Sequence, residues 1–209
     1  MPEILLATHN AGKVREIRQL AACAGWRWHG LDDFPPVPEA VEDAATFAEN
    51  ARRKALHYAA ATGLPTLADD SGLEVDCLGG APGVHSARYA GAPRDDAANN
   101  RKLVAALAGV PLEQRTARFR CAMAFARPGT ALAQTQGIVE GLIIDEPRGD
   151  NGFGYDPHFL LPELDKTMAE LPPKEKNALS HRGQALRAML PEIARILEAE
   201  RRAESGTSL

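Results

Sequence analysis

The spacing of apolar residues predicts a strand–helix–strand unit at the start of the chain. Residues 4–7 are a short apolar run, which is typical of a buried strand. A polar stretch follows at 8–13, and from Val14 onward apolar residues recur at helical spacing. Residues 26–31 are a second candidate strand. Three prolines and five acids in 32–43 then indicate an exposed loop.

A second helix is predicted after this loop. The spacing of Thr46 and Glu49 matches a capping box, and the apolar residues from Phe47 to Ala59 fall on one helical face. Gly63 is expected to end the helix. Lys54 lies at the edge of the apolar face, which leaves two interpretations open. Its amine reaches into a cleft, or its stem covers the apolar face while its amine stays in water.

Two adjacent acids follow the next apolar run. We expect a strand over 64–68 that ends at Asp69 and Asp70, a turn at Ser71 and Gly72, and a second strand from 73 to 77. Paired carboxylates at a sheet edge destabilise a fold unless a cation or an acid–base reaction uses them. We therefore place the centre of a metal-dependent active site here.

The middle of the chain predicts a helix and two strands. Residues 95–107 have helical spacing. Residues 118–126 and 132–144 alternate or are β-branched, with Pro128 and Gly129 between them, which indicates an antiparallel pair in a second lobe. Together with the first unit, these elements indicate an α/β fold with mixed sheets.

Two later segments carry candidate binding residues. Phe153 and Tyr155 lie in a glycine-rich loop, where they either stack on a nucleobase or pack under a neighbouring strand. Ser180 is a candidate N-cap for a helix that Pro191 would kink or divide. His181 and Arg182 then lie at a helix N-terminus, which indicates either an anionic ligand or a solvated basic helix start.

Composition excludes several classes of protein. The net charge of −4 gives no broad basic surface, so we expect no nucleic-acid polymer as a partner. The three cysteines are far apart and in no CxxC spacing, which fits reduced thiols in the cytoplasm and makes a zinc site improbable. No signal peptide is recognisable, and no apolar run reaches the roughly 20 residues of a membrane span. We expect a cytoplasmic globular protein.

The candidate residues fit one class of ligand. Carboxylates without paired histidine or cysteine are the oxygen ligands that Mg²⁺ prefers. Separated cations and a polar turn at a helix N-terminus suit a polyphosphate. The sum predicts a nucleoside triphosphate bound with Mg²⁺, without a Walker loop. The acids are Glu42, Asp69 and Asp70; the cations are Lys13, Lys54, Lys176 and Arg182, with Arg88 as a further candidate; and the small polar groups are Thr8, Asn10 and Ser71.

Six motifs in order resemble the inosine triphosphatase family, the noncanonical purine nucleotide pyrophosphatases. They are Thr8-x-Asn10-x-x-Lys13; Thr46-Phe-x-Glu-Asn50 with Lys54; Ala68-Asp-Asp-Ser-Gly-Leu73; Gly79-Gly-Ala-Pro-Gly83 with Ser86-Ala-Arg-Tyr89; Gly152-Phe-Gly-Tyr-Asp-Pro157; and Lys176 with Ser180-His-Arg-Gly183. The resemblance implies an elongated central mixed sheet flanked by helices, with a cleft between two lobes, and a homodimer. The whole chain, 1–209, would be one such domain, with 204–209 as a disordered polar tail.

The resemblance also implies an activity and residue roles. The activity is Mg²⁺-dependent hydrolysis of ITP, dITP or XTP to the monophosphate and pyrophosphate, which removes these nucleotides from the pool. Asp70 would bind the metal with Glu42 and accept the proton of the attacking water; Asp69 receives no assigned role. Substrate would contact Thr8, His9, Asn10, Ala11, Gly12, Lys13, Lys54, Ser71, Arg88, Phe153, Gly154, Tyr155, Asp156, Lys176, His181 and Arg182.

One position departs from the family pattern. Ala44 stands where the family usually has glycine, and if that glycine supplied a positive φ, the loop here would shift. The choice of metal ligand among Glu39, Glu42 and Asp43 therefore rests on the spacing of Glu42 to Thr46.

Three other functions compete with this interpretation. A Maf-like pyrophosphatase would act on modified or pyrimidine nucleotides with the same architecture. A nucleotide-binding module would bind without catalysis. A structural acidic edge would need neither nucleotide nor Mg²⁺.

Overall fold

The computed structural model describes residues 1–206, except for the side chains of 23 and 204. Its strands form one seven-stranded sheet in the order β2-β1-β3-β4-β5-β6-β7 among the described residues. The pairs β1–β2 and β1–β3 are parallel, whereas β5–β6 and β6–β7 are antiparallel, so the predicted mixed α/β sheet is confirmed. The strands are β1 (Glu3–Leu6), β2 (Arg27–His29), β3 (Thr66–Val75), β4 (Thr116–Arg127), β5 (Thr130–Ile143), β6 (Phe159–Leu161) and β7 (Lys166–Thr167).

The helices follow the predicted order and add one that the sequence did not predict. They are α1 (Ala11–Leu20), α2 (Phe47–Thr62), α3 (Asp96–Ala106), α4 (Pro173–Leu179) and α5 (His181–Gly206), of which α4 was missed. Local signals fixed several ends: Thr46 caps α2 through the amide of Glu49, and Gly63 ends α2 with φ at +75°. No helix among the described residues is long and apolar enough to cross a membrane.

The chain divides into two compact units. Unit 1 comprises Met1–Asp70, Ala122–Gln136 and the chain from Gly183 onward, and unit 2 comprises Ser71–Cys121 and Gly137–Arg182. Strands β3, β4 and β5 therefore contribute residues to both units. The prediction that the β4–β5 pair lies in a second lobe was wrong, because each of the two strands has residues in both units.

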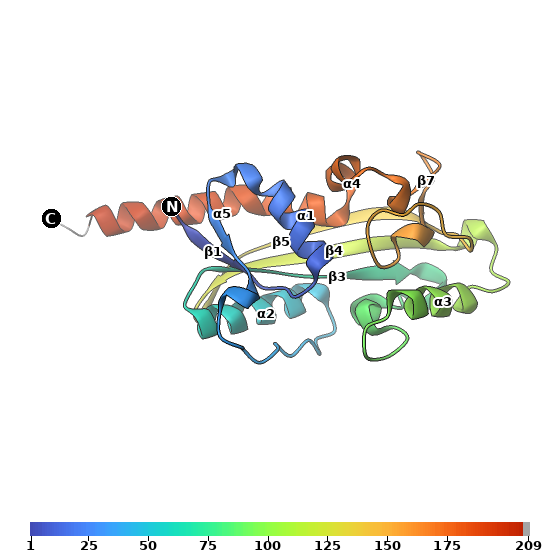
Figure 1. Cartoon of the computed structure of the whole chain (residues 1–209), viewed down its shortest axis with the longest axis horizontal. Helices are drawn as coiled ribbons and strands as arrows, with labels where there is room; N and C mark the ends of the chain where they lie inside the picture. Colours follow the sequence, from blue (N-terminus) through green and yellow to red (C-terminus); the bar gives the residue numbers. More distant parts are fainter. Residues whose placement is uncertain (207–209) are drawn as a thin grey trace. The chain divides into compact units, whose positions relative to one another are not determined.

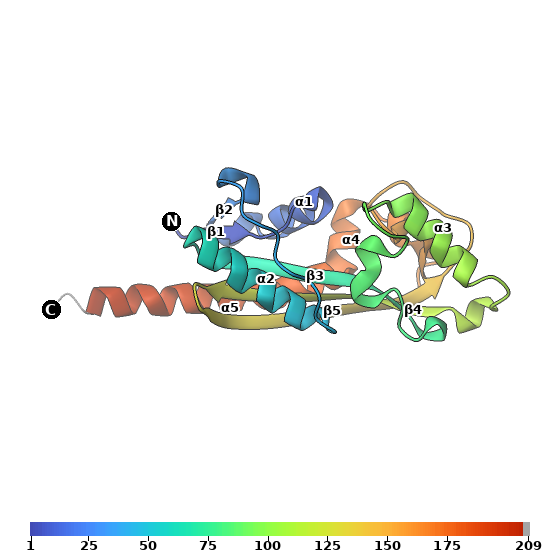
Figure 2. The ribbon, with the colours of Figure 1, turned by 90° about the horizontal axis from the view of Figure 1, so that it is seen from below.

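In unit 1, helices α2 and α5 cover opposite faces of the strands (Figure 1 and Figure 2). Neighbouring side chains of β5 reach the two helices: Gln134 donates to the carbonyl of Ala48 in α2, and Thr135 donates to that of Ala185 in α5. This is the alternation of a strand, in which successive side chains point to opposite faces. The buried core includes Ile4, Leu5 and Leu6 of β1.

Unit 2 has its own hydrophobic core. It joins the second half of β3, helix α3 and strands β4 to β6. Within it, the rings of Phe119 and Phe159 stack with their centroids 4.4 Å apart. The core consists of Leu73, Val75, Leu103, Leu107, Ala117, Phe119, Ile143, Tyr155, Phe159, Leu161, Met168 and Leu171.

Strand β3 runs without a break through Asp69, Asp70, Ser71 and Gly72, so the predicted turn at Ser71 and Gly72 was wrong. Gly72 has another function. A Cβ at this position would lie 2.3 Å from the hydroxyl oxygen of Ser86, whose hydroxyl also accepts the amide of Leu73 at 2.9 Å. Glycine is needed here because another segment approaches closely, and not because the chain turns.

The end of the chain also differs from expectation. Pro191 lies inside α5, which is one helix from His181 to Gly206. A proline removes one backbone donor, and the buried side chains of Met189, Ile193 and Leu197 hold the helix on both sides of it. The first three residues of the predicted tail, 204–206, belong to α5, and 207–209 lie outside the described residues.

Candidate active site

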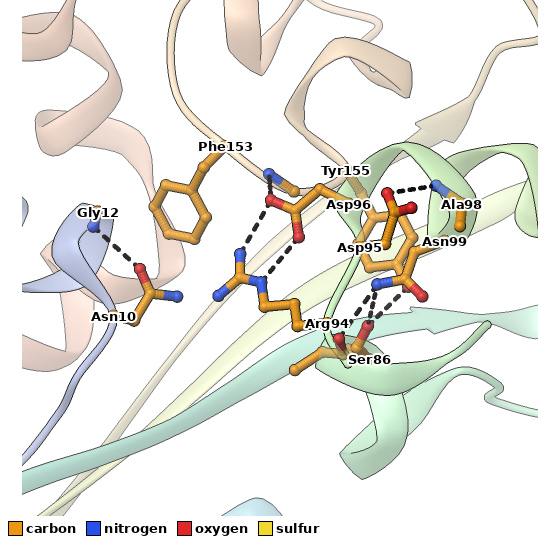
Figure 3. A network of polar contacts seen from close by, with 12 residues as sticks. Asn10, Gly12, Ser86, Arg94, Asp95, Asp96, Ala98, Asn99, Phe153 and Tyr155 are labelled. Carbon is orange, nitrogen blue, oxygen red and sulfur yellow. Dashed lines mark hydrogen bonds and ion pairs between the residues drawn. The ribbon is translucent and has the colours of Figure 1, made fainter. Parts of the chain in front are cut away.

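The polar turn before α1 is tightly capped. Asn10 is the N-cap of α1, and its side-chain oxygen accepts the amides of Gly12 at 2.9 Å and Lys13 at 3.2 Å (Figure 3). Thr8 in turn accepts the amide of Asn10 at 3.2 Å. Two of the backbone donors expected for a phosphate are thus used by the cap. The groups that remain exposed here include the side chain of His9 and the N-terminal end of α1 at Ala11.

Asp69 and Asp70 are both buried in unit 1, and their side chains make different contacts. Successive residues of a strand point to opposite faces. The carboxylate of Asp69 pairs with Lys13 at 2.8 Å, near the start of α1. The carboxylate of Asp70 accepts a hydrogen bond from the side-chain amide of Asn50 in α2 at 3.0 Å. The structure thus separates two acids that sequence alone could not distinguish.

Burial and neighbouring groups act in opposite directions on the pKa of Asp70. Burial raises the pKa of its carboxyl group, although Lys13, Lys54 and the Asn50 hydrogen bond act in the opposite direction. The side-chain oxygen of Asn50 accepts the amide of Ala44 at 2.9 Å, so Asn50 also fixes the preceding loop. Positive φ among the described non-glycine residues occurs only at Asp165, so Ala44 needs no glycine-like backbone.

Lys54 is buried, with 8% of its surface exposed, so its amine does not extend into solvent. The amine pairs with Glu42 at 2.6 Å and donates to the carbonyl of Asp69 at 3.2 Å. Burial lowers the pKa of Lys54, but the charges of Glu42, Asp69 and Asp70 outweigh this effect and the pKa is raised. Of the two interpretations of Lys54, the structure supports the one in which the amine points inward.

The acids of the preceding loop differ in their surroundings. Asp43 is exposed and pairs with Arg53 at 2.7 Å, and Glu39 is also exposed. Glu42 alone of these three contacts Lys54, and its charge also acts to raise the pKa of Asp70. These observations favour Glu42 as the second carboxylate of the site.

Glu42 and Asp70 are carboxylates of the kind that could hold a magnesium ion. No group of three or more histidine, cysteine or acidic residues that could hold a metal occurs in the described part of the chain. Mg²⁺ in phosphate-processing sites takes one or two carboxylates, and phosphate oxygens and water complete its coordination. Glu42 and Asp70 supply that number of carboxylates, and both have only oxygen donors.

Unit 2 carries the candidate base-binding loop. The amide of Phe153 donates to the carboxylate of Asp156 at 2.8 Å, and the buried Lys176 pairs with the same oxygen at 2.7 Å. Three cations surround the Phe153 ring: Lys176 at 4.9 Å, Arg182 at 5.5 Å and Arg94 at 5.9 Å from its centroid. The partly exposed ring is therefore the centre of a cationic cluster.

Tyr155 differs from Phe153 although it lies only two residues away. Its ring belongs to the hydrophobic core of unit 2, and its hydroxyl donates to the carbonyl of Ser86 at 2.8 Å. Burial raises the pKa of this hydroxyl. Of the two interpretations of this loop, the side chain of Tyr155 supports the one in which the aromatic ring packs against the fold.

The start of α5 is buried, so the interpretation as a solvated basic helix start was wrong. Arg182 is 2% exposed and donates to the hydroxyl of Ser71 at 2.9 Å. The ring of His181 stacks on Phe119 with centroids 4.9 Å apart. Arg88, in contrast, is exposed, and no partner for its guanidinium is found among the described residues.

Comparison with known proteins identifies the family. Residues 4–192 match the model of the Ham1 family. The chain belongs to the Ham1 family. A curated relative from Geobacillus kaustophilus, named dITP/XTP pyrophosphatase, is 52% identical over 204 residues, which cover 98% of this chain and 100% of the relative. A relative of the same name from Bacillus subtilis is 48% identical and covers 95% of this chain and 98% of its own length.

Solved Ham1 structures have the same fold. A HAM1 protein from Coxiella burnetii superposes with a TM-score of 0.84 at 43% identity, over 93% of this chain and 100% of that one. The Ham1 protein from Staphylococcus aureus gives a TM-score of 0.81 at 38% identity, over 95% and 99%. The resemblance to the inosine triphosphatase family is thereby confirmed.

Three polar residues of this Ham1 protein were not recognised from the sequence as part of the candidate site: Asn50, Asp96 and Asn100. Asn50 and Lys54 are four residues apart, so both lie on the buried face of α2. Asp96 and Asn100 of α3 have the same spacing and both contact the backbone of Gly154. Polar residues four apart on a helix face were the signal available in the sequence.

Proposed function

We propose that this protein hydrolyses noncanonical purine nucleoside triphosphates (ITP, dITP and XTP) to the monophosphate and pyrophosphate, with Mg²⁺. The observation that carries the proposal is the buried carboxylate of Asp70, which Asn50 orients among the charges of Lys13 and Lys54. The names of the curated relatives, dITP/XTP pyrophosphatase, support the same substrate class.

Unit 1 supplies the groups for the triphosphate. Lys13 and Lys54 are paired with Asp69 and Glu42 in the free protein, and these pairs hold both amines in place until phosphate oxygens replace the carboxylates. The turn from Thr8 through His9, Asn10, Ala11 and Gly12 to Lys13 contributes polar donors at the positive end of α1.

Asp70 is the proposed proton acceptor. Water attacks the α-phosphorus, its proton passes to the Asp70 carboxylate, and the bond to the bridging oxygen breaks, so that pyrophosphate leaves with the electron pair. Mg²⁺ held by Glu42 and Asp70 would neutralise the negative charge that develops on the leaving group.

Unit 2 supplies the groups for the base. Phe153 offers a ring face for stacking, in a contact worth roughly 1–3 kcal/mol. Lys176, His181 and Arg182 carry donors suited to a 6-oxo purine, with Ser71, Gly154 and Asp156 as supporting contacts. A 6-amino group would leave such donors unpaired, which costs about 1–3 kcal/mol for each buried donor.

A panel of nucleotides tests the proposal. Pyrophosphate release is followed with ITP, dITP, XTP, ATP, GTP, dTTP and UTP, with and without Mg²⁺. We expect turnover of the first three only, and only with Mg²⁺. Turnover of dTTP or UTP without turnover of ITP would overturn the proposal in favour of a Maf-like enzyme.

Three further measurements test a rival function, the oligomeric state and the location. Asp70→Asn should abolish turnover and leave nucleotide binding intact. A non-catalytic binding module would instead show negligible turnover in the wild type, and Asp70→Asn would change neither this turnover nor binding. Light scattering tests the proposed homodimer, and fractionation of cells tests the proposed cytoplasmic location.

A further inference from the structure

Helix α3 binds the loop that carries Phe153 through two side chains. The carboxylate of Asp96 accepts the backbone amide of Gly154 at 3.0 Å, and the side-chain amide of Asn100 donates to the carbonyl of Gly154 at 2.9 Å. The two residues are four apart, so they lie on one face of the helix. Both backbone polar groups of the residue after Phe153 are thus bound by α3.

The other side of Phe153 is fixed separately. Its own amide donates to Asp156, which is buried and paired with Lys176. Phe153 therefore lies between two anchors, α3 on one side and the Asp156–Lys176 pair on the other. Because the amides of Phe153 and Gly154 are both bound, the backbone that carries the ring cannot move without breaking hydrogen bonds to charged groups.

Asp96 is not needed to cap its helix. Asp95 is the N-cap of α3 and accepts the amide of Ala98 at 2.9 Å. The Asp96 carboxylate instead accepts two hydrogen bonds from Arg94, at 2.8 and 2.9 Å, and that guanidinium faces the Phe153 ring (Figure 3). Asp96 thus joins the loop backbone to one of the three cations around the ring.

We propose that Asp96 and Asn100 are positioning residues: they fix the loop that carries Phe153 and so set the affinity and selectivity for the purine base. Arg94 acts with them, because its bidentate ion pair with Asp96 holds the guanidinium over the Phe153 ring. This inference rests on the proposed function, in which Phe153 stacks on the base. Neither residue takes part in the chemical step at Asp70.

The first test compares two variants with the same change of charge. Asp96→Asn removes the charged acceptor of Gly154 and of Arg94. Asp95→Asn is the matched control, because it lies one residue away and asparagine is an equally good N-cap. Amide hydrogen exchange of the segment 150–157 is measured in both, without substrate. We expect faster exchange in Asp96→Asn and wild-type exchange in Asp95→Asn.

The second test measures catalysis. In Asp96→Asn we expect KM for ITP to rise about tenfold with kcat nearly unchanged. This pattern is expected when a variant loses an interaction that the substrate makes equally in the ground state and in the transition state. Inhibition by inorganic tripolyphosphate, which has no base, should be unchanged. The preference for ITP over ATP in kcat/KM should fall. A merely destabilised protein would lose kcat and would not separate these ligands.

Asn100→Ser provides an independent variant. It removes the donor to the carbonyl of Gly154 and leaves Asp96 and Arg94 in place, and we expect the same pattern with a smaller rise in KM. Wild-type exchange of 150–157 in both Asp96→Asn and Asn100→Ser would overturn the inference whether or not the enzyme turns over ITP. An inactive wild-type protein with faster exchange in the variants would instead overturn the proposed function alone.

Discussion

Gly152→Ala is the substitution whose effect the structure predicts most fully. Gly152 precedes Phe153 and has φ at +80°. A Cβ at this position would lie 2.1 Å from a carboxylate oxygen of Asp156 and 3.1 Å from the amine of Lys176. Alanine therefore introduces two separate penalties, one in its own backbone and one in the buried ion pair.

The two penalties differ in size. A residue with a Cβ in the left-handed region costs about 1–2 kcal/mol. Displacing Asp156 disrupts an ion pair in which both side chains are nearly fully buried, and breaking such a pair costs about 3–5 kcal/mol. We therefore expect a loss of about 4 kcal/mol or more, which is a large fraction of the 5–15 kcal/mol typical of a native protein.

Gly129→Ala is the matched control. Gly129, in the turn between β4 and β5, also has φ at +80°, but a Cβ there would meet no atom within 4 Å. Urea unfolding followed by far-ultraviolet circular dichroism gives the free energy of unfolding of both variants. We expect about 1–2 kcal/mol for Gly129→Ala. Equal losses in the two variants would refute the reasoning about the Asp156–Lys176 pair.

Three other predictions concern the charged groups of unit 1. Asp70→Asn should abolish turnover and, in metal-free buffer, raise the melting temperature at pH 7. Burial raises the pKa of Asp70, so its ionised form destabilises the fold. This gain should disappear in acid, where Asp70 is protonated, and calorimetry at several pH values would show a wild-type advantage at pH 7 if the reasoning is wrong. Lys54→Met should raise KM for ITP about tenfold or more, because a charged hydrogen bond to phosphate is lost. The exposed Arg53→Met is the control, and equal KM values would contradict a phosphate role for Lys54. Removing Mg²⁺ with EDTA should stop pyrophosphate release and leave the circular dichroism spectrum unchanged; full activity in EDTA would exclude the metal.

Local signals were sufficient for the elements that begin and end within a few residues. Thr46 and Gly63 mark the ends of α2 through contacts with their own neighbours, and both were predicted. Gly72 shows where this approach fails. Ser71-Gly72 looks like a turn locally, whereas the reason for the glycine is Ser86, fourteen residues further along the chain and invisible to a local pattern.

The candidate site shows the same division. The residue types at Asp70, Lys54 and Phe153 could be recognised in sequence because their chemistry is unusual for their surroundings. Their supporting partners could not, because the contact of Asn50 with Asp70 depends on how α2 lies on β3. Phe153 and Tyr155 have similar side chains in one loop, yet only the fold decides that one ring is accessible and the other is core.

The unbroken course of β3 limits how this chain can vary in length. A strand has a side-chain period of two, so inserting or deleting one residue between Thr66 and Asp70 would exchange the faces of everything that follows. The acid that now contacts Asn50 would then take the direction of Asp69, and Gly72 would no longer meet Ser86. Length changes should therefore abolish activity within β3 and be tolerated in the exposed acidic loop ahead of Glu42, near Asp32 and Asp33. In a library of single-residue insertions along the gene, we expect no active clone to carry its insertion within β3.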